Sequence, residues 1–118
     1  MREFKYILNG KIPEACGDIL KWSRWFENVD NRRLAQTTLG PYWISTVFLG
    51  LDHSWSGAGA PILFESMVFD EEEAFSCERY STWSEAEKGH ARICEIVQRA
   101  LDRSELVTAE TLRTLFSR

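Results

Sequence analysis

Residues 40–69 read GPYWISTVFLGLDHSWSGAGAPILFESMVF, and this segment contains neither lysine nor arginine. Within it, residues 42–51 and 62–69 are rich in β-branched and aromatic side chains, which favour β-strands. Glycine, serine and tryptophan fill the loop between these two runs. We therefore expect the segment to form the buried centre of a β-sheet with one unusual connection.

The flanking sequence predicts further strands on both sides of this centre. A Gly40-Pro41 turn precedes residue 42, and in it glycine accepts a positive φ while proline supplies a φ of about −65°. An Asn9-Gly10 turn signal ends an N-terminal strand, and residues 13–17 predict an irregular approach to a helix. The expected strands are 4–8, 33–39, 42–51, 62–69 and 75–81.

Two helices are expected because apolar residues recur with helical spacing. The first covers residues 19–27 behind an Asp18 N-cap, with Ile19, Trp22 and Phe26 on one face. The second begins at a capping box formed by Thr82 and Glu85 and runs to residue 101. Its apolar stripe comprises Ala86, His90, Ile93, Val97 and Leu101.

Ser104 or Thr108 is expected to cap a short C-terminal helix. Together these elements predict an α+β fold in a single domain over residues 1–118. We expect a mostly antiparallel meander of four to five strands, packed on one face by two helices.

Composition argues against several classes of protein. The net charge of −4 opposes general nucleic-acid binding, which needs a basic surface. Three cysteines without a CxxC pair are typical of a reducing cytosol. No segment has the roughly 18 apolar residues of a membrane span, and the N-terminus lacks the apolar run of a signal peptide. We therefore expect a cytoplasmic protein with no membrane partner.

The strands 62–69 and 75–81 permit a prediction of register. If residues 70–74 form the loop, three pairs of side chains lie on one face, because side chains alternate along a strand. The pairs are Phe69 with Phe75, Met67 with Cys77, and Glu65 with Arg79. Either charge of the third pair would be costly to bury alone, so we expect a supporting salt bridge. Alternatively, Arg79 stays partly available to hold a small anionic ligand.

The loop after residue 51 carries the next candidates for a site. Asp52 and His53 end a strand beside a glycine-rich loop, and an imidazole can act as acid or base near neutral pH. No G-x-S-x-G nucleophile elbow accompanies them, so hydrogen bonds that fix the loop are the alternative role. Trp55 either folds back over Trp43 or is presented to a partner, where tryptophan is a frequent anchor.

His90 lies in the apolar stripe of the second helix, directly after Gly89. Glycine costs about 1 kcal/mol in a helix interior, which predicts close packing of a strand or of a bound group at this point. His90 is therefore either a core histidine bonded to backbone or part of a ligand site. No HxxxH or CxxC pair occurs, so we expect no metal and no cofactor.

An ordered set of short segments carries a family resemblance. The segments are WSRWFE (22–27), STVFLGLDH (45–53), LFESMVF (63–69) and ERYSTW (78–83), followed by Glu85-Ala86 and Gly89-His90. In these segments the chain resembles a widespread family of small proteins encoded by tailed bacteriophages and prophages. The resemblance spans residues 6–97. It implies a phage origin and the cytoplasm of a bacterial host, but no particular activity, cofactor or catalytic residue.

This origin favours a non-catalytic accessory binding protein. Such a protein would act as a host-takeover or counter-defence inhibitor that binds a host protein or sequesters a small anionic ligand. The alternatives are a small hydrolase or transferase that uses His53 and Glu65, and a virion or morphogenesis component. A homo-oligomer is also expected, because a chain this aromatic has apolar surface to spare. The expected contact residues are Asp52, His53, Trp55, Glu65, Arg79 and His90.

Overall fold

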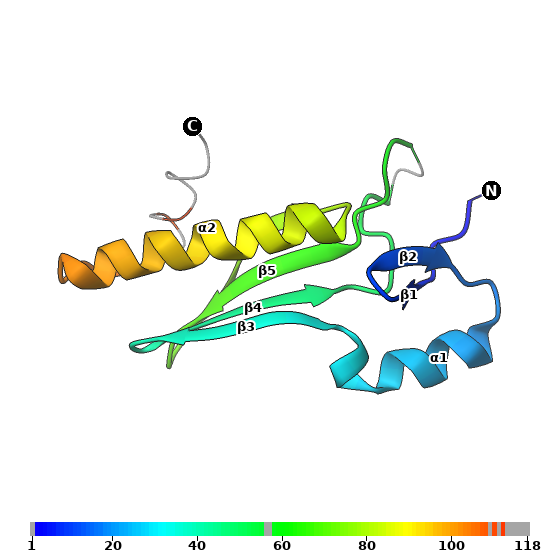
Figure 1. Ribbon diagram of the computed structural model, residues 1–118, viewed down its shortest axis with the longest axis horizontal. Helices are drawn as coiled ribbons and strands as arrows, with labels where there is room; N and C mark the ends of the chain where they lie inside the picture. The colour runs from blue at the N-terminus through cyan, green and yellow to red at the C-terminus, as the bar shows by residue number, and fades with distance from the viewer. Residues whose placement is uncertain (1, 56–57, 109, 111, 113–118) are drawn as a thin grey trace.

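The computed structural model describes residues 2–55, 58–108, 110 and 112, and it has the predicted α+β fold (Figure 1). Four antiparallel strands form one sheet in the order β3-β4-β5-β6, and β1 and β2 form a separate hairpin. The elements are β1 (Tyr6–Asn9), β2 (Ile12–Ala15), α1 (Ile19–Glu27), the 3-10 helix η1 (Val29–Asn31), β3 (Arg33–Leu39), β4 (Tyr42–Phe48), β5 (Phe64–Phe69), β6 (Ala74–Tyr80) and α2 (Trp83–Asp102).

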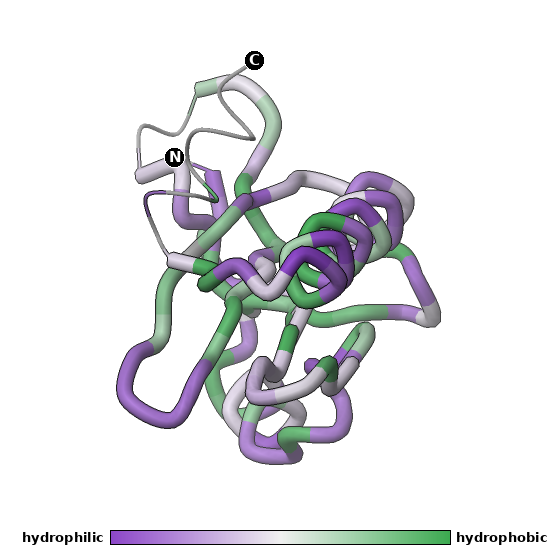
Figure 2. The backbone as a smooth tube through the Cα atoms, turned by 90° about the vertical axis from the view of Figure 1, so that its left-hand side faces the viewer, coloured by the Kyte–Doolittle hydropathy of each residue, from purple (hydrophilic) through white to green (hydrophobic). Residues whose placement is uncertain are grey.

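Helix α2 lies along one face of the four-stranded sheet (Figures 1 and 2). The predicted capping box starts it, since Glu85 N donates to Thr82 Oγ1 and Thr82 N donates to the Glu85 carboxylate. Leu101 is half-buried, and Ala100 takes the last buried position. The buried residues of α2 are Ala86, Gly89, His90, Ile93, Val97 and Ala100. An isolated helix is only marginally stable in water, so α2 depends on this buried face.

Helix α1 has the predicted bounds and N-cap, but it reaches the core from the end of the sheet. The Trp25 ring meets the Phe48 ring edge-on, with centroids 5.5 Å apart. Trp22 Nε1 donates to the Gly50 carbonyl at 3.0 Å. Ile19, expected on the packed face, is 56% exposed. Aromatic contacts and a few hydrogen bonds, including one from Arg32 Nε to the Phe26 carbonyl, therefore hold this helix.

The predicted register of β5 and β6 is right at one end and wrong at the other. The loop is one residue shorter than expected, so Phe69 pairs with Ala74 instead of Phe75, and the expected pair of Met67 with Cys77 is also absent. A β-bulge in β6 then adds one residue and cancels the error. Beyond the bulge, Glu65 faces Arg79 as predicted.

The N-terminal segment contains a strand that the sequence analysis did not predict. Residues 13–17 were expected to be irregular, but β2 pairs with β1 across a turn at Gly10, whose φ is +63°. Pro13 lies within β2, where its missing N–H is tolerated because a two-stranded hairpin has only edge strands. Gly10 and Pro13, which are residue types typical of turns, therefore belong to a hairpin of two edge strands.

The C-terminal helix predicted after residue 104 falls mostly outside the described residues. Within them, Leu112 N donates to the Thr108 carbonyl at 3.0 Å. Leu112 is buried in the same core cluster as Ile93 and Val97 of α2. Leu112 therefore extends the core on the side of the sheet that α2 covers.

Gly89 permits the close approach of α2 to β6. A Cβ atom at this position would lie 2.0 Å from the Tyr80 hydroxyl oxygen and 2.3 Å from its ring carbon Cζ. Gly89 and Tyr80 are both buried. The predicted close packing at Gly89 is confirmed, and the group that packs there is a strand side chain.

Replacing Gly89 with alanine is therefore expected to destabilise the fold, although alanine favours helices by about 1 kcal/mol. We expect Gly89→Ala to lower the free energy of unfolding by about 2–4 kcal/mol, because Tyr80 or the helix must shift. Urea denaturation followed by circular dichroism measures the loss.

Gly17→Ala is the matched control, because its Cβ would lie 3.4 Å from Glu3 Oε2, an ordinary contact distance. We expect this control to remain within about 1 kcal/mol of the parent protein. A Gly89→Ala variant that equals or exceeds the parent in stability would contradict the packing argument.

Candidate functional site

The loop between β4 and β5 is held by one buried carboxylate, that of Asp52. Its Oδ1 accepts hydrogen bonds from Ser54 N at 2.9 Å and from Ile62 N at 3.0 Å. Its Oδ2 forms an ion pair with Arg2 at 2.6 Å, and the side chain has no exposed surface. These contacts join both ends of the loop to the N-terminal segment. Asp52 therefore has the structural role that the sequence analysis left open.

The same contacts keep Asp52 ionised. Burial by itself raises the pKa of this carboxyl group, but hydrogen bonds from Ser54, Ile62 and Arg2 outweigh burial and lower the pKa to about 2. At neutral pH the group is a fully engaged anion. Such an anion cannot donate a proton, and its lone pairs are already occupied by donors.

Trp55 is the most exposed aromatic side chain of the described residues, at 65%. Its φ is +56°, a left-handed backbone conformation that is rare for bulky residues. The indole ring lies 5.1 Å from the His53 ring and 6.5 Å from the Phe4 ring, centroid to centroid. Trp43 stacks instead on Phe69, at 4.8 Å. Of the two predicted arrangements, Trp55 has the exposed one.

Glu65 and Arg79 form the predicted ion pair, with Arg79 Nε 2.9 Å from Glu65 Oε2. The pair lies on the sheet face opposite α2, because Glu65 faces Val47 whereas the neighbouring Ser66 faces Thr46 on the α2 side. Glu65 is buried, and the Arg79 side chain is 47% exposed. The salt-bridge interpretation is confirmed, and ligand binding by Arg79 stays a prediction.

His90 lies on the other face, in a buried polar network between α2 and the sheet. Its Nδ1 is 2.7 Å from Thr46 Oγ1, and its Nε2 is 2.8 Å from Thr37 Oγ1. Thr46 Oγ1 is in turn 2.6 Å from Ser66 Oγ, which accepts from the Tyr80 hydroxyl at 2.9 Å. The expected core histidine is present, but its partners are strand side chains and not backbone groups.

One arrangement of protons satisfies this whole network. If Tyr80 donates to Ser66, Ser66 to Thr46 and Thr46 to His90 Nδ1, then His90 Nε2–H donates to Thr37. The arrangement requires a neutral imidazole, and burial lowers the pKa of His90 in agreement with it. Burial also raises the pKa of Tyr80 to about 12, so the hydroxyl keeps its proton.

The predicted site residues therefore occupy three places. Asp52, His53 and Trp55 share one loop, and a hydrogen bond from His53 N to the Ile62 carbonyl ties its backbone to the segment just before β5. The Glu65–Arg79 pair lies further along β5 on the uncovered face. His90 lies in the core on the α2 side. The structure brings the loop residues together and separates His90 from them.

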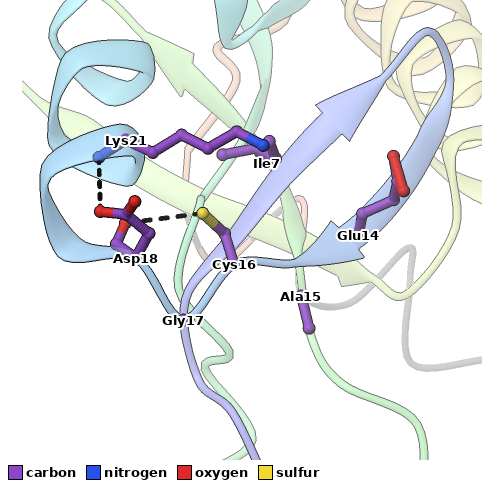
Figure 3. Close-up of a pocket in the computed structure, with 7 residues that line it drawn as sticks. All are labelled: Ile7, Glu14, Ala15, Cys16, Gly17, Asp18 and Lys21. Carbon is purple, nitrogen blue, oxygen red and sulfur yellow. Dashed lines mark hydrogen bonds between the residues drawn. The ribbon is translucent and has the colours of Figure 1, made fainter.

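A hollow that the sequence analysis missed lies between the β1–β2 hairpin and the start of α1 (Figure 3). Its volume is about 330 Å³. The lining residues are Ile7, Glu14, Ala15, Cys16, Gly17, Asp18 and Lys21. The Asp18 carboxylate caps α1, and the Cys16 thiol donates to the Asp18 carbonyl. No sequence signal indicates this hollow, because it depends on the unpredicted strand β2.

Among the described residues, no group of three or more histidine, cysteine or acidic side chains is arranged to hold a metal ion. None of the described helices is both long and apolar enough to span a membrane. The sequence matches no family model, no curated protein and no solved structure. The resemblance to phage and prophage proteins therefore stays a prediction.

The contacts of Asp52, which we call the Asp52 anchor, can be tested by substitution. Asp52→Asn is expected to lower the free energy of unfolding by about 2–3 kcal/mol, because its amide cannot pair with Arg2. This loss of stability is smaller than the loss expected for a fully buried ion pair, since the Arg2 side chain is 27% exposed. Chemical denaturation measures it, with Asp30→Asn as control, because Asp30 is 83% exposed in its pair with Arg33.

The stabilisation that Asp52 provides depends on pH, and the direction of this dependence follows from its pKa. The folded-state pKa of Asp52, about 2, is below the ordinary value of 3.8, so the anchor stabilises the protein above pH 3.8. That contribution is lost as the pH falls from 3.8 towards 2, and Asp52→Asn should remove this part of the acid sensitivity. Equal stability of Asp52→Asn and Asp30→Asn would contradict the role of Asp52.

His90 should make the protein less stable below pH 6.5. Its folded-state pKa is lowered from 6.5, so below this pH the unfolded chain takes up the proton first. The stabilisation present above pH 6.5 is therefore lost as the pH falls. A His53→Gln variant retains His90 as its one histidine. Urea denaturation of this variant from about pH 7.5 to about pH 5 measures how its free energy of unfolding changes with pH. Stability that stays constant or rises on acidification would contradict the neutral network.

Proposed function

We propose that this chain is a non-catalytic binding protein of a tailed phage or prophage that contacts a host protein through Trp55. The phage origin comes from the sequence resemblance, and the contact surface comes from the loop geometry. The surface consists of Trp55 with His53 and Phe4 beside it. The partner that fits it is a protein with an apolar pocket for an indole ring.

The observation that carries the proposal is the exposed position of Trp55 on a left-handed backbone. Such a conformation costs about 1–3 kcal/mol for a bulky residue, and residues of this kind gather at ligand contacts. With 65% of its surface in water, the indole recovers little of that cost by packing. A partner that buries the ring would recover it.

The Asp52 anchor supports the same proposal. Because the carboxylate ties Ser54 and Ile62 together, the backbone on both sides of the loop is fixed before any partner arrives. A contact residue that is already held in place loses less conformational entropy on binding. Tryptophan in such a position is the residue type most often found at the energetic centre of protein interfaces.

The charged groups near the loop favour binding over catalysis. Both oxygens of Asp52 already accept hydrogen bonds, and Glu65, which the hydrolase or transferase alternative would use, is paired with Arg79. General acid–base catalysis needs a group that is within reach of substrate and able to exchange a proton. His53 contacts the indole ring of Trp55, as expected of a residue that supports a binding surface.

Replacement of Trp55 tests the proposal. Tagged parent protein is used to capture a partner from host cells, and the purified partner is then titrated by calorimetry. We expect Trp55→Ala to weaken this binding by about 30-fold or more, the loss typical of an interface hot spot.

Trp43→Ala is the matched control, because Trp43 is also exposed, at 41%, but lies on the sheet face. We expect it to bind like the parent protein while Trp55→Ala keeps the parent circular dichroism spectrum. A partner that binds Trp55→Ala and the parent equally would refute the assignment of the surface.

A further inference from the structure

The four-stranded sheet ends in two edge strands, β3 and β6. Within the described residues, neither has a further strand paired to its outer side (Figure 1). An open edge presents unpaired backbone N–H and C=O groups, which are a template for pairing with another chain. Natural proteins usually protect such edges with charges, prolines or bulges.

Only one of the two edges carries this protection along its length. Strand β6 has a bulge in its middle and two charged residues, Glu78 and Arg79. Strand β3 has its irregularity and its charge at one end, near Arg33. The remaining part of β3 is regular, uncharged and free of proline, and it consists of Ala35, Gln36, Thr37, Thr38 and Leu39.

We propose that this edge pairs antiparallel with β3 of a second copy of the chain, about a two-fold axis at Thr37. In this register Gln36 of each copy lies opposite Thr38 of the other, and Ala35 lies opposite Leu39. The two four-stranded sheets become one continuous sheet, and both α2 helices lie on the same face of it.

The backbone of β3 fits this register. Leu39 and Tyr42 close a two-residue turn, so the backbone groups of Leu39 and Thr37 are directed towards β4. The backbone groups of successive residues in a strand point in opposite directions, so the N–H and C=O groups of Gln36 and Thr38 are directed away from β4, towards the open edge. These are the two residues that face each other across the proposed two-fold axis.

The side chains of β3 are also self-complementary, as a two-fold interface requires. The polar pair of Gln36 with Thr38 lies on the uncovered face, where both residues are exposed. The apolar pair of Ala35 with Leu39 lies on the α2 face and would continue the core. Arg33 falls beyond the paired segment, so the two copies bring no like charges face to face.

Sedimentation of the full chain over a concentration series tests the proposal. We expect a monomer–dimer equilibrium for the parent protein. Gln36→Lys should raise the dimer dissociation constant by about tenfold or more, because two ammonium groups then lie diagonally across the axis. Gln98→Lys makes the same change on the exposed side of α2, where lysine can still reach Asp102, and should leave the constant unchanged.

Hydrogen exchange provides a second measurement that does not depend on a variant. The amides of Gln36 and Thr38 should become more protected as the protein concentration rises, while those of β6 should not. A parent protein that stays monomeric at every concentration overturns the proposal. It is also overturned if Gln36→Lys dimerises like the parent, or if the two amides exchange at a rate independent of concentration.

Discussion

The position of α2 on the sheet depends on one buried polar network. Thr37, Thr46, Ser66 and Tyr80 come from four different strands, and all are connected through hydrogen bonds to His90 of the helix. A buried polar group without a partner costs free energy, so a shift of α2 that breaks the bonds of His90 to Thr37 and Thr46 carries a penalty. Apolar packing provides the larger stabilisation, but it is less directional. The network therefore fixes how the layers fit together.

That fixed core determines where the loop of Trp55 can lie. Beyond β4 and β5, the chain continues side by side through backbone bonds from Leu49 to Leu63 and from His53 to Ile62. Asp52 is thereby placed beside Ile62, and one carboxylate can hold both ends of the loop. Trp55 follows three residues later and is presented to solvent. The left-handed backbone of Trp55 is tolerated because Asp52 holds Ser54 and Ile62 in place through hydrogen bonds.

The sequence predicted features that depend on local chemistry. The capping box of Thr82 and Glu85, the bounds of α1 and β3, and the close packing at Gly89 all follow from residues near one another in the chain. The Glu65–Arg79 pair was also predicted, but through two errors that cancel, a shorter loop and a bulge. Neither error could be detected from residue type, because a bulge shifts the side-chain pattern without a local signal.

The candidate site was harder to predict, because roles depend on partners distant in sequence. Asp52 resembles a catalytic carboxylate in sequence, yet Arg2, fifty residues away, makes it an anchor. His90 is in the predicted stripe, but nothing near it in the chain identifies Thr37 or Thr46 as its partners. Strand β2 was missed because proline and glycine are typical of turns as well as of edge hairpins. In each case the missing information was a long-range contact.

The two proposed surfaces lie at different places and would reinforce each other. The edge centred on Thr37 is near the turn at Gly40, whereas the loop of Trp55 is at the opposite end of β4. Antiparallel pairing of two copies would therefore present the two Trp55 loops at the far ends of one continuous sheet. A dimer of that shape would contact two partners, or two sites on one oligomeric partner, and the second contact would then form at high effective concentration. A modest affinity of each loop would then be enough for strong overall binding.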